Sequence, residues 1–111
     1  MDMVKRGDVV IAVFSGDYGK PRPAVVVQTD LANPTHSSLV LCPITSHLEN
    51  APLFRLEVRP SPENSLEKSC QIMVDKITTV RKDKVRQVIG RLDEDTMIRF
   101  NRSLAFWLGL G

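Results

Sequence analysis

A polar loop between two apolar runs carries the side chains best suited to chemistry. Residues 16–23 read Gly-Asp-Tyr-Gly-Lys-Pro-Arg-Pro and supply one carboxylate, Asp17, and two cations, Lys20 and Arg22. Arg22 stands between two prolines, and Pro23 favours an extended backbone at the residue before it. An arginine on a stiff backbone loses less entropy when it binds an anion, and its planar guanidinium matches a phosphate group. The loop therefore predicts an anion-binding arginine, although the same composition also fits a solvated turn.

A second polar segment, residues 45–52, follows another apolar run and begins with two hydroxyl side chains. The polar residues of interest in and around the two segments are Asp17, Arg22, Gln28, Thr45, Ser46 and His47. If both segments lie at the ends of neighbouring strands, a carboxylate, a guanidinium and a hydroxyl meet on one rim of the fold. Such a group suits cleavage of a phosphodiester without a metal ion.

Cleavage of RNA in this way demands little covalent chemistry from a protein. The 2′-hydroxyl attacks its own phosphorus, so the protein must stabilise charge on the phosphorane, align the attack and move two protons. Arg22 suits the first task because a guanidinium stays charged, and for the same reason it is a poor base. Asp17 is the better candidate base. His47 has a suitable intrinsic pKa, but a single histidine on a polar loop also fits a solvated position.

The length and charge of the chain limit the class of protein that these side chains can belong to. The chain of 111 residues predicts one domain, residues 1–111. A net charge of +2 and a pI near 8.7 are compatible with a nucleic-acid partner without requiring one, so attraction would come from a local patch. We see no signal peptide and no apolar run long enough to span a membrane, and we expect a cytoplasmic protein.

The two cysteines, Cys42 and Cys70, both lie within apolar runs, and we expect them to be buried and free. The chain has no CxxC motif, and His36 and His47 do not have the spacing of metal ligands. We therefore expect neither a metal ion nor another cofactor.

Short apolar runs separated by turn residues predict a mainly β fold. The expected strands are residues 8–14, 24–28, 39–44, 54–59, 69–74, 77–80 and 85–92. Residues 29–38, 45–52 and 60–65 read as loops, and residues 81–84 as one helical turn. Pro43 near the end of its run suggests a strand margin or an edge strand. This pattern is typical of a small barrel.

The C-terminal segment has helical spacing. Asp93 or Asp95 can cap the helix, and Gly109 is a natural stop. One stripe comprises Met97, Ile98, Asn101, Leu104, Ala105 and Leu108, widened by Phe100 and Trp107. The stripe predicts packing against the barrel, and its width leaves a subunit contact open. The fold class is therefore a small barrel closed by one C-terminal α-helix.

Four short motifs occur in an order that resembles the MazF/PemK/Kid toxins of bacterial toxin–antitoxin systems. They are Lys-Arg-Gly-Asp-Val-Val at residues 5–10, Arg-Pro-Ala-Val-Val-Val at 22–27, Cys-Pro-Ile-Thr-Ser at 42–46 and Val-Asp-Lys-Ile-Thr-Thr-Val at 74–80. The ending Leu-Ala-Phe-Trp-Leu-Gly-Leu at 104–110 is also similar. The resemblance covers almost the whole chain.

The resemblance implies an SH3-like barrel of the CcdB/PemK kind that works as a homodimer. It implies a ribosome-independent, metal-independent endoribonuclease that cuts single-stranded RNA and leaves 2′,3′-cyclic phosphate and 5′-hydroxyl ends. It also implies a cognate antitoxin with a disordered tail, and contact with operator DNA only through that antitoxin. The implied catalytic residues are Arg22 and Thr45, with Asp17 implicated in some members. The expected RNA-binding residues are Lys20, Gln28, Ser46, His47 and Lys76.

Two departures from the family pattern concern the fourth motif. Lys76 stands where many members have Gln, and Met73 stands where some members have a catalytic arginine. The second departure leaves more of the chemistry to Arg22, Thr45 and Asp17.

The sequence is also compatible with two other functions. The ending at residues 107–110 is similar to that of CcdB, which would make the protein a gyrase-binding toxin without nuclease activity. A non-catalytic barrel that binds RNA or a peptide is the other. It is weakened because Tyr18 is the only aromatic residue in the loops, and stacking platforms need several.

Overall fold

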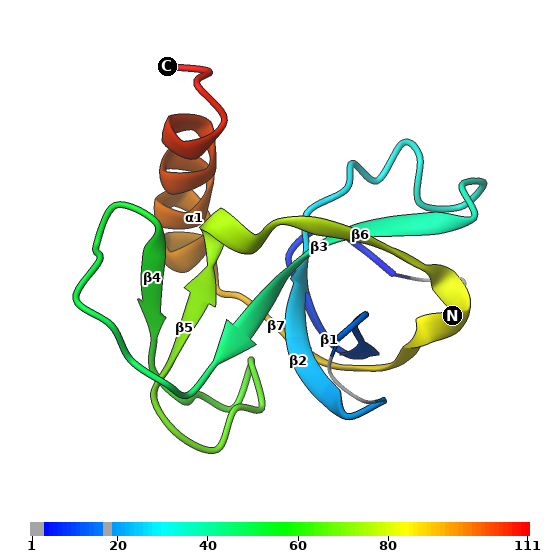
Figure 1. Cartoon of the computed structure of the whole chain (residues 1–111), viewed down its shortest axis with the longest axis horizontal. Helices are drawn as coiled ribbons and strands as arrows, with labels where there is room; N and C mark the ends of the chain where they lie inside the picture. The colour runs from blue at the N-terminus through cyan, green and yellow to red at the C-terminus, as the bar shows by residue number, and fades with distance from the viewer. Residues whose placement is uncertain (1–3, 17–18) are drawn as a thin grey trace.

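The computed structural model describes residues 4–16 and 19–111 (Figure 1). Within these ranges the chain forms seven strands, two 3₁₀ turns and one α-helix. The elements are β1 (Asp8–Val13), β2 (Pro21–Val26), β3 (Ser38–Thr45), β4 (Arg55–Val58), β5 (Cys70–Met73), η1 (Val74–Lys76), β6 (Thr78–Arg81), η2 (Lys82–Lys84), β7 (Val85–Arg91) and α1 (Glu94–Trp107). The prediction of a mainly β fold with one C-terminal helix is confirmed.

The strands form one antiparallel sheet in the order β4-β5-β3-β2-β1-β7, and β6 pairs with β3. No ladder joins β4 to β7 in the part of the chain that the structure describes, so the sheet does not close into a ring. The closed barrel predicted from the strand pattern is therefore not confirmed. A closed ring would need one more ladder between these two end strands.

Strand β3 is the centre of the sheet because it belongs to both of its halves (Figure 1). It pairs with β6 through residues Ser38 to Leu41 and with β5 at Ile44 and Thr45. Pro43 lies between these two ladders, where β3 pairs with neither β6 nor β5. The missing N–H of the proline therefore costs no hydrogen bond on this side of the strand. The suggestion that Pro43 marks an edge strand is wrong.

Two apolar clusters use opposite faces of the same strands. Cys42 and Ile44 of β3 contribute to the cluster beneath α1, whereas Leu39 and Leu41 contribute to the cluster enclosed by β1, β2, β6 and β7. Successive side chains of a strand point to opposite faces, so a strand with core on both sides must be apolar throughout. This requirement explains the continuous apolar runs of the sequence.

Asp93 caps the N-terminus of helix α1, and its side chain accepts a hydrogen bond from the Thr96 N–H at 2.6 Å. That bond lowers the pKa of the Asp93 carboxyl. The buried face of α1 comprises Thr96, Phe100 and Leu104, spaced four residues apart, and Phe100 is fully buried. The predicted stripe is wrong at Ile98, which is 45% exposed because it lies about 200° round the helix from Phe100.

Leu108 was also expected on the buried stripe and is 47% exposed. It follows the last helical residue, where the end of α1 has passed beyond the strands that it covers (Figure 1). The C-terminal end of the helix is therefore less buried than its first three turns.

Gly90 of β7 lies directly under the loop between β4 and β5. A Cβ atom at this position would lie 2.3 Å from the Glu63 carbonyl oxygen and 2.9 Å from the Asn64 Cα. The Arg91 N–H donates to the same Glu63 oxygen at 2.9 Å, so the loop is fixed to the strand at this point. Only a glycine allows this close approach.

We expect Gly90→Ala to lower the free energy of unfolding by about 1–3 kcal/mol, because backbone atoms of the loop must move to admit the methyl group. Urea titration of the purified protein measures the change. The exposed Gln87 on the same strand provides the control, since Gln87→Ala should change stability by less than about 0.5 kcal/mol. Equal stability of the Gly90 variant and the wild type would contradict this packing.

Candidate active site

An open groove of about 430 Å³ lies at the end of the sheet where β2 begins and β3 ends. Its polar lining residues are Lys20, Arg22, Thr45, Ser46, Ser65, Glu67 and Lys68. Ile11, Pro23, Ile44, Leu66, Cys70 and Ile89 are among the residues that form its apolar floor. The groove therefore brings a guanidinium, two ammonium groups and hydroxyls together over an apolar base.

Arg22 and Thr45 lie on adjacent strands of the groove. The ladder between β2 and β3 runs from Ala24–Pro43 to Val26–Leu41, and Arg22 and Thr45 each lie two residues beyond its Ala24–Pro43 end. Both residues are half-buried and both line the groove, so the structure brings the two predicted groups together.

Both residues lie inside strands, although the sequence placed them in loops. Strand β2 starts at Pro21, three residues earlier than predicted, and β3 includes Thr45. Arg22 pairs with Ala12 of β1 and so belongs to a regular ladder. A strand holds a side chain more firmly than a loop does, which favours a fixed orientation of the guanidinium.

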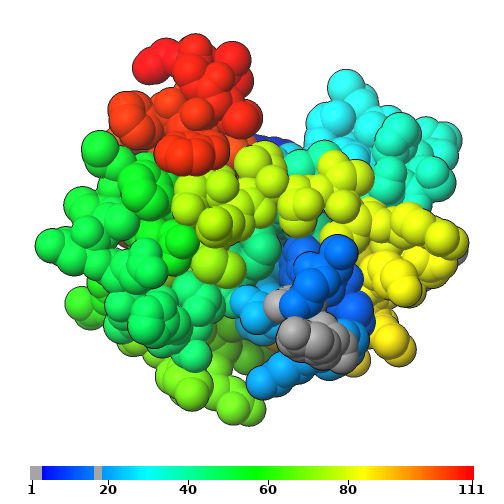
Figure 2. All heavy atoms as spheres, in the orientation of Figure 1, coloured from blue at the N-terminus to red at the C-terminus, as the bar shows by residue number. Residues whose placement is uncertain are grey.

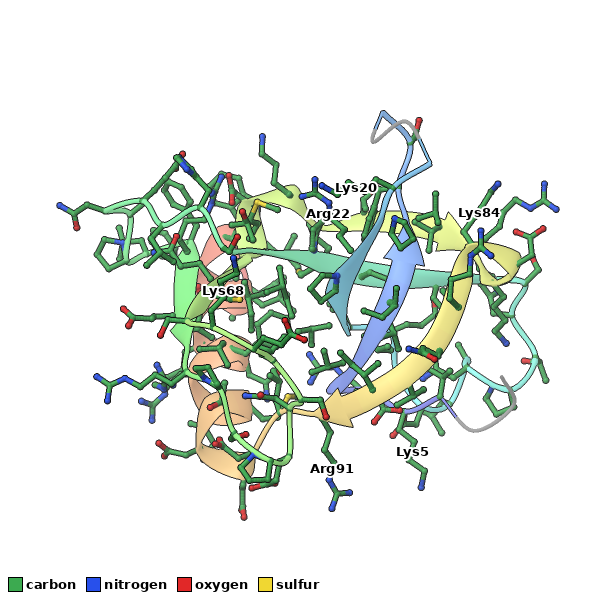
Figure 3. The ribbon with its side chains drawn as sticks, turned by 90° about the horizontal axis from the view of Figure 1, so that it is seen from below. Lys5, Lys20, Arg22, Lys68, Lys84 and Arg91 are labelled. Carbon is green, nitrogen blue, oxygen red and sulfur yellow. The ribbon has the colours of Figure 1, made fainter. Side chains whose placement is uncertain are left out.

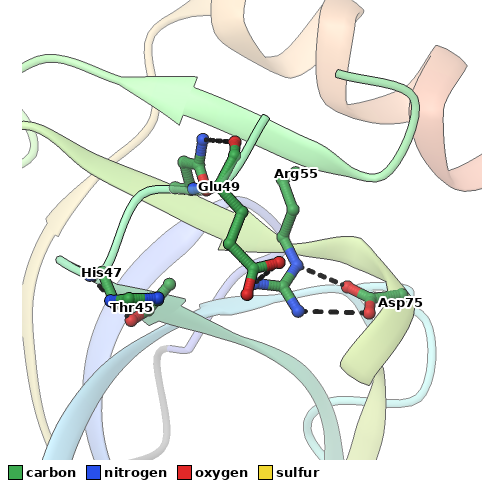
Figure 4. A network of polar contacts seen from close by, with 6 residues as sticks. Thr45, His47, Glu49, Arg55 and Asp75 are labelled. Atoms are coloured by element: carbon green, nitrogen blue, oxygen red, sulfur yellow. Dashed lines mark hydrogen bonds and ion pairs between the residues drawn. The ribbon is translucent and has the colours of Figure 1, made fainter. Parts of the chain in front are cut away.

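The Thr45 hydroxyl has a defined partner. Its Oγ1 accepts a hydrogen bond from the backbone N–H of His47 at 3.0 Å (Figure 4). A hydroxyl also has one proton to donate, and that proton is not used in this contact. The arrangement leaves the Thr45 O–H able to donate to an oxygen in the groove.

The other predicted site residues divide into two groups. Lys20 and Ser46 line the groove, and Figure 3 shows Lys20 beside Arg22. Gln28, His47 and Lys76 are not among the described residues that line it. Asp17 lies outside the described residues.

Gln28 has a structural partner far from Arg22. Its side-chain Nε2 donates to the Ser38 carbonyl oxygen at 3.1 Å, and its backbone carbonyl oxygen accepts from the Asn33 side chain. It follows the opposite end of β2, roughly 20 Å from Arg22 at about 3.3 Å per strand residue. The structure does not bring Gln28 to the predicted site.

The loop before β5 forms a wall of the groove that the sequence did not reveal. It supplies Ser65, Glu67 and Lys68, and Figure 3 shows Lys68 projecting from this loop. Asn64 holds the loop because its buried Oδ1 accepts from the Ser61 and Leu66 N–H groups, each at 3.0 Å. The turn composition predicted a loop here, but nothing local indicated that it folds back towards Arg22.

The cysteines are buried and free, as predicted. Burial raises the pKa of the Cys42 thiol to about 12 and also raises that of Cys70. A thiol is a nucleophile only when ionised, so neither cysteine is suited to attack at neutral pH.

Residues 4–16 and 19–111 contain no group of three or more acidic, histidine or cysteine side chains placed to hold a metal ion. In the same ranges no helix has the length and apolar character needed to cross a membrane.

Residues 5–108 match the family described as the PemK-like, MazF-like toxins of type II toxin–antitoxin systems, and the chain belongs to this family. It is 37% identical over 108 residues to the probable endoribonuclease MazF of Mycolicibacterium smegmatis, which covers 96% of this chain and 98% of that relative. The family predicted from the sequence motifs is confirmed. The match favours it over the CcdB-like alternative.

Solved structures agree with the fold. The Mycobacterium tuberculosis toxin MazF-mt6 has a TM-score of 0.81 at 16% identity and covers 94% of this chain and 98% of that one. A mycobacterial endoribonuclease in complex with its cognate antitoxin has a TM-score of 0.80 at 24% identity, covering 97% of each chain. A MazE–MazF structure from Deinococcus radiodurans has a TM-score of 0.78 at 20% identity, also covering 97% of each chain.

Proposed function

We propose that this toxin is a metal-independent endoribonuclease that cuts single-stranded RNA and so inhibits translation and growth. The observation that carries the proposal is the meeting of Arg22 and Thr45 in one groove. The relative from Mycolicibacterium smegmatis is named a probable endoribonuclease, which supports the same activity. The cationic side chains Lys20, Arg22 and Lys68 give the groove the charge that an RNA backbone requires.

The reaction is an internal transesterification. The 2′-oxygen of the RNA attacks the adjacent phosphorus, the bond from phosphorus to the 5′-oxygen breaks, and a 2′,3′-cyclic phosphate remains. The proton of the 2′-hydroxyl passes to a base, for which we propose Asp17, and the departing 5′-oxygen takes a proton from a water molecule to become a hydroxyl. Asp17 then gives its proton to the hydroxide ion that remains. Atoms and charge balance without a metal ion or another reactant.

Arg22 and Thr45 act on the charge that develops at phosphorus. The guanidinium donates to the non-bridging oxygens, and the Thr45 O–H donates to one of them from the opposite strand. Lys20 and Ser46, which line the same groove, contact the neighbouring phosphate and sugar. Lys68 approaches the RNA from the other wall.

We also propose that the protein is a cytoplasmic homodimer with a cognate antitoxin, which alone links it to operator DNA. Leu53, Phe106, Trp107, Leu108 and Leu110 are large apolar side chains left exposed around the end of α1. Figure 2 shows this end standing out from the rest of the surface. An apolar patch of this kind suits a subunit contact.

We propose that the fold is an open form of the SH3-like barrels of the CcdB/PemK kind. Strand β3 bends from one half of the sheet to the other, as a strand in such a barrel does. The antitoxin complex among the similar structures supports an antitoxin partner for this chain as well.

We expect the purified protein to cleave a long single-stranded RNA at full rate in excess EDTA, because the groove offers donors and no cluster of metal ligands among the described residues. Mapping the new 5′ ends by kinase labelling should show 5′-hydroxyl groups and reveal the cleavage sequence. A requirement for Mg²⁺ would reject the metal-free mechanism. Trapped DNA breaks with intact RNA would instead support the gyrase-binding alternative.

A further inference from the structure

Gln71 is the residue of β5 that pairs directly with Thr45. It is only 6% exposed, although it carries a polar side chain. Its Oε1 accepts from the Glu49 N–H at 3.0 Å, and its Nε2 donates to the Glu49 carbonyl oxygen at 2.8 Å. One amide side chain thus satisfies both backbone groups of a residue in the segment that follows Thr45.

The segment from Thr45 to Glu49 is consequently held at both ends. At its start, the Thr45 Oγ1 accepts from the His47 N–H. At its end, the Gln71 amide holds Glu49 against β5, the strand on which Gln71 faces Thr45. The rotation of the Thr45 side chain is fixed by the His47 contact, and the position of His47 depends on a segment that Gln71 anchors.

The side chain of Glu49 also forms an ion pair. Arg55 binds Asp75 with two nitrogens, at 2.9 and 3.3 Å, and its Nη1 lies 3.5 Å from the Glu49 Oε2. The hydrogen bond that Arg55 donates to Asp75 is the main reason that the pKa of Arg55 is raised. The Glu49 side chain is 48% exposed, so its ion pair with Arg55 is weaker than the buried hydrogen bonds between Gln71 and the Glu49 backbone.

We propose that Gln71 is a positioning residue for RNA cleavage, which it assists by fixing the segment that orients the Thr45 hydroxyl. The inference rests on the proposed function. Gln71 is buried and does not line the groove, so it acts through Thr45 and not on the RNA. A glutamate here would set a carboxylate oxygen against the Glu49 carbonyl, and a leucine would leave two backbone groups without their partner.

We expect Gln71→Leu and Gln71→Glu to lower kcat for a short single-stranded RNA by about 10-fold to 10²-fold, with KM changed less than two-fold, because the hydroxyl is misplaced while the groove persists. Rates are measured well below the Tm of each variant. Thr96→Val is the matched control, since it also removes a buried polar group but lies on α1 away from the groove. It should lower Tm and leave kcat unchanged.

A double-variant comparison separates positioning from stability. If Gln71 acts through the hydroxyl, Gln71→Leu should cause no further loss of kcat when Thr45 is already valine. A further ten-fold loss in that background would overturn the proposal, as would a wild-type kcat in the Gln71→Leu variant alone.

Hydrogen exchange of the His47 amide provides a readout that needs no RNA. We expect faster exchange in Gln71→Leu than in the wild type or in Thr96→Val. Unchanged exchange would overturn the positioning role even if the enzyme is active. Faster exchange in Gln71→Leu, together with a wild-type protein that does not cleave RNA, would reject the proposed function and leave the link between Gln71 and Thr45 standing.

Discussion

Arg22→Ala is expected to lower the single-turnover rate of RNA cleavage about 10²–10³-fold and to abolish growth arrest. Arg22 lies within the regular β1–β2 ladder and lines the groove together with Thr45, so a strand backbone holds its guanidinium at the groove. Removing one preorganised donor from a developing oxyanion typically has an effect of this size. The rate is measured with the enzyme in excess of the RNA and at enzyme concentrations far above the dissociation constant of the RNA, so that weaker binding does not contribute.

Two further variants define what the arginine supplies. Arg22→Lys keeps the charge but loses the planar pair of donors, and it should recover only a small part of the rate. Lys20→Ala removes a cation from the same groove and should mainly raise KM. Circular dichroism and antitoxin binding should be unchanged in all three variants. Full toxicity of Arg22→Ala would contradict the assignment of the site.

Thr45→Val is expected to lower kcat about 10²-fold, because valine matches the shape of threonine but has no O–H to donate. It also removes the acceptor of the His47 N–H, so the segment after β3 should become looser. Thr45→Ser keeps the hydroxyl and should retain most of the activity. A serine variant as slow as the valine variant would show that the hydroxyl is not the active group. The comparison uses cleavage rates of one defined RNA.

The sequence predicted the strands and the helix well because each depends on local patterning. Continuous apolar runs indicated strands buried on both faces, and the two clusters sharing β3 confirm this. Strand ends were less certain where prolines occur. Pro21 and Pro23 suggested a loop, yet both lie in β2 and pair with β1, because tertiary pairing outweighed the local signal.

The site was only partly predictable. Arg22 and Thr45 were proposed from their residue types and their motifs, and both line the same groove. Lys68 and Gln71 could not be found, since one depends on a loop that folds back over Gly90 and the other on a side chain pairing with a backbone 22 residues away. Such contacts between distant segments leave no spacing in the sequence.

Strand β3 belongs to both halves of the sheet, and this determines how the toxin unfolds. The eight residues of β3 contribute side chains to both apolar clusters. If one half of the sheet unfolds, the apolar cluster of the other half therefore loses the side chains that β3 supplies. The two halves should therefore unfold in a single cooperative transition and not as separable units. Because Thr45 closes this strand, a partly melted toxin would keep no residual catalytic centre, and its activity would track the fully native population alone.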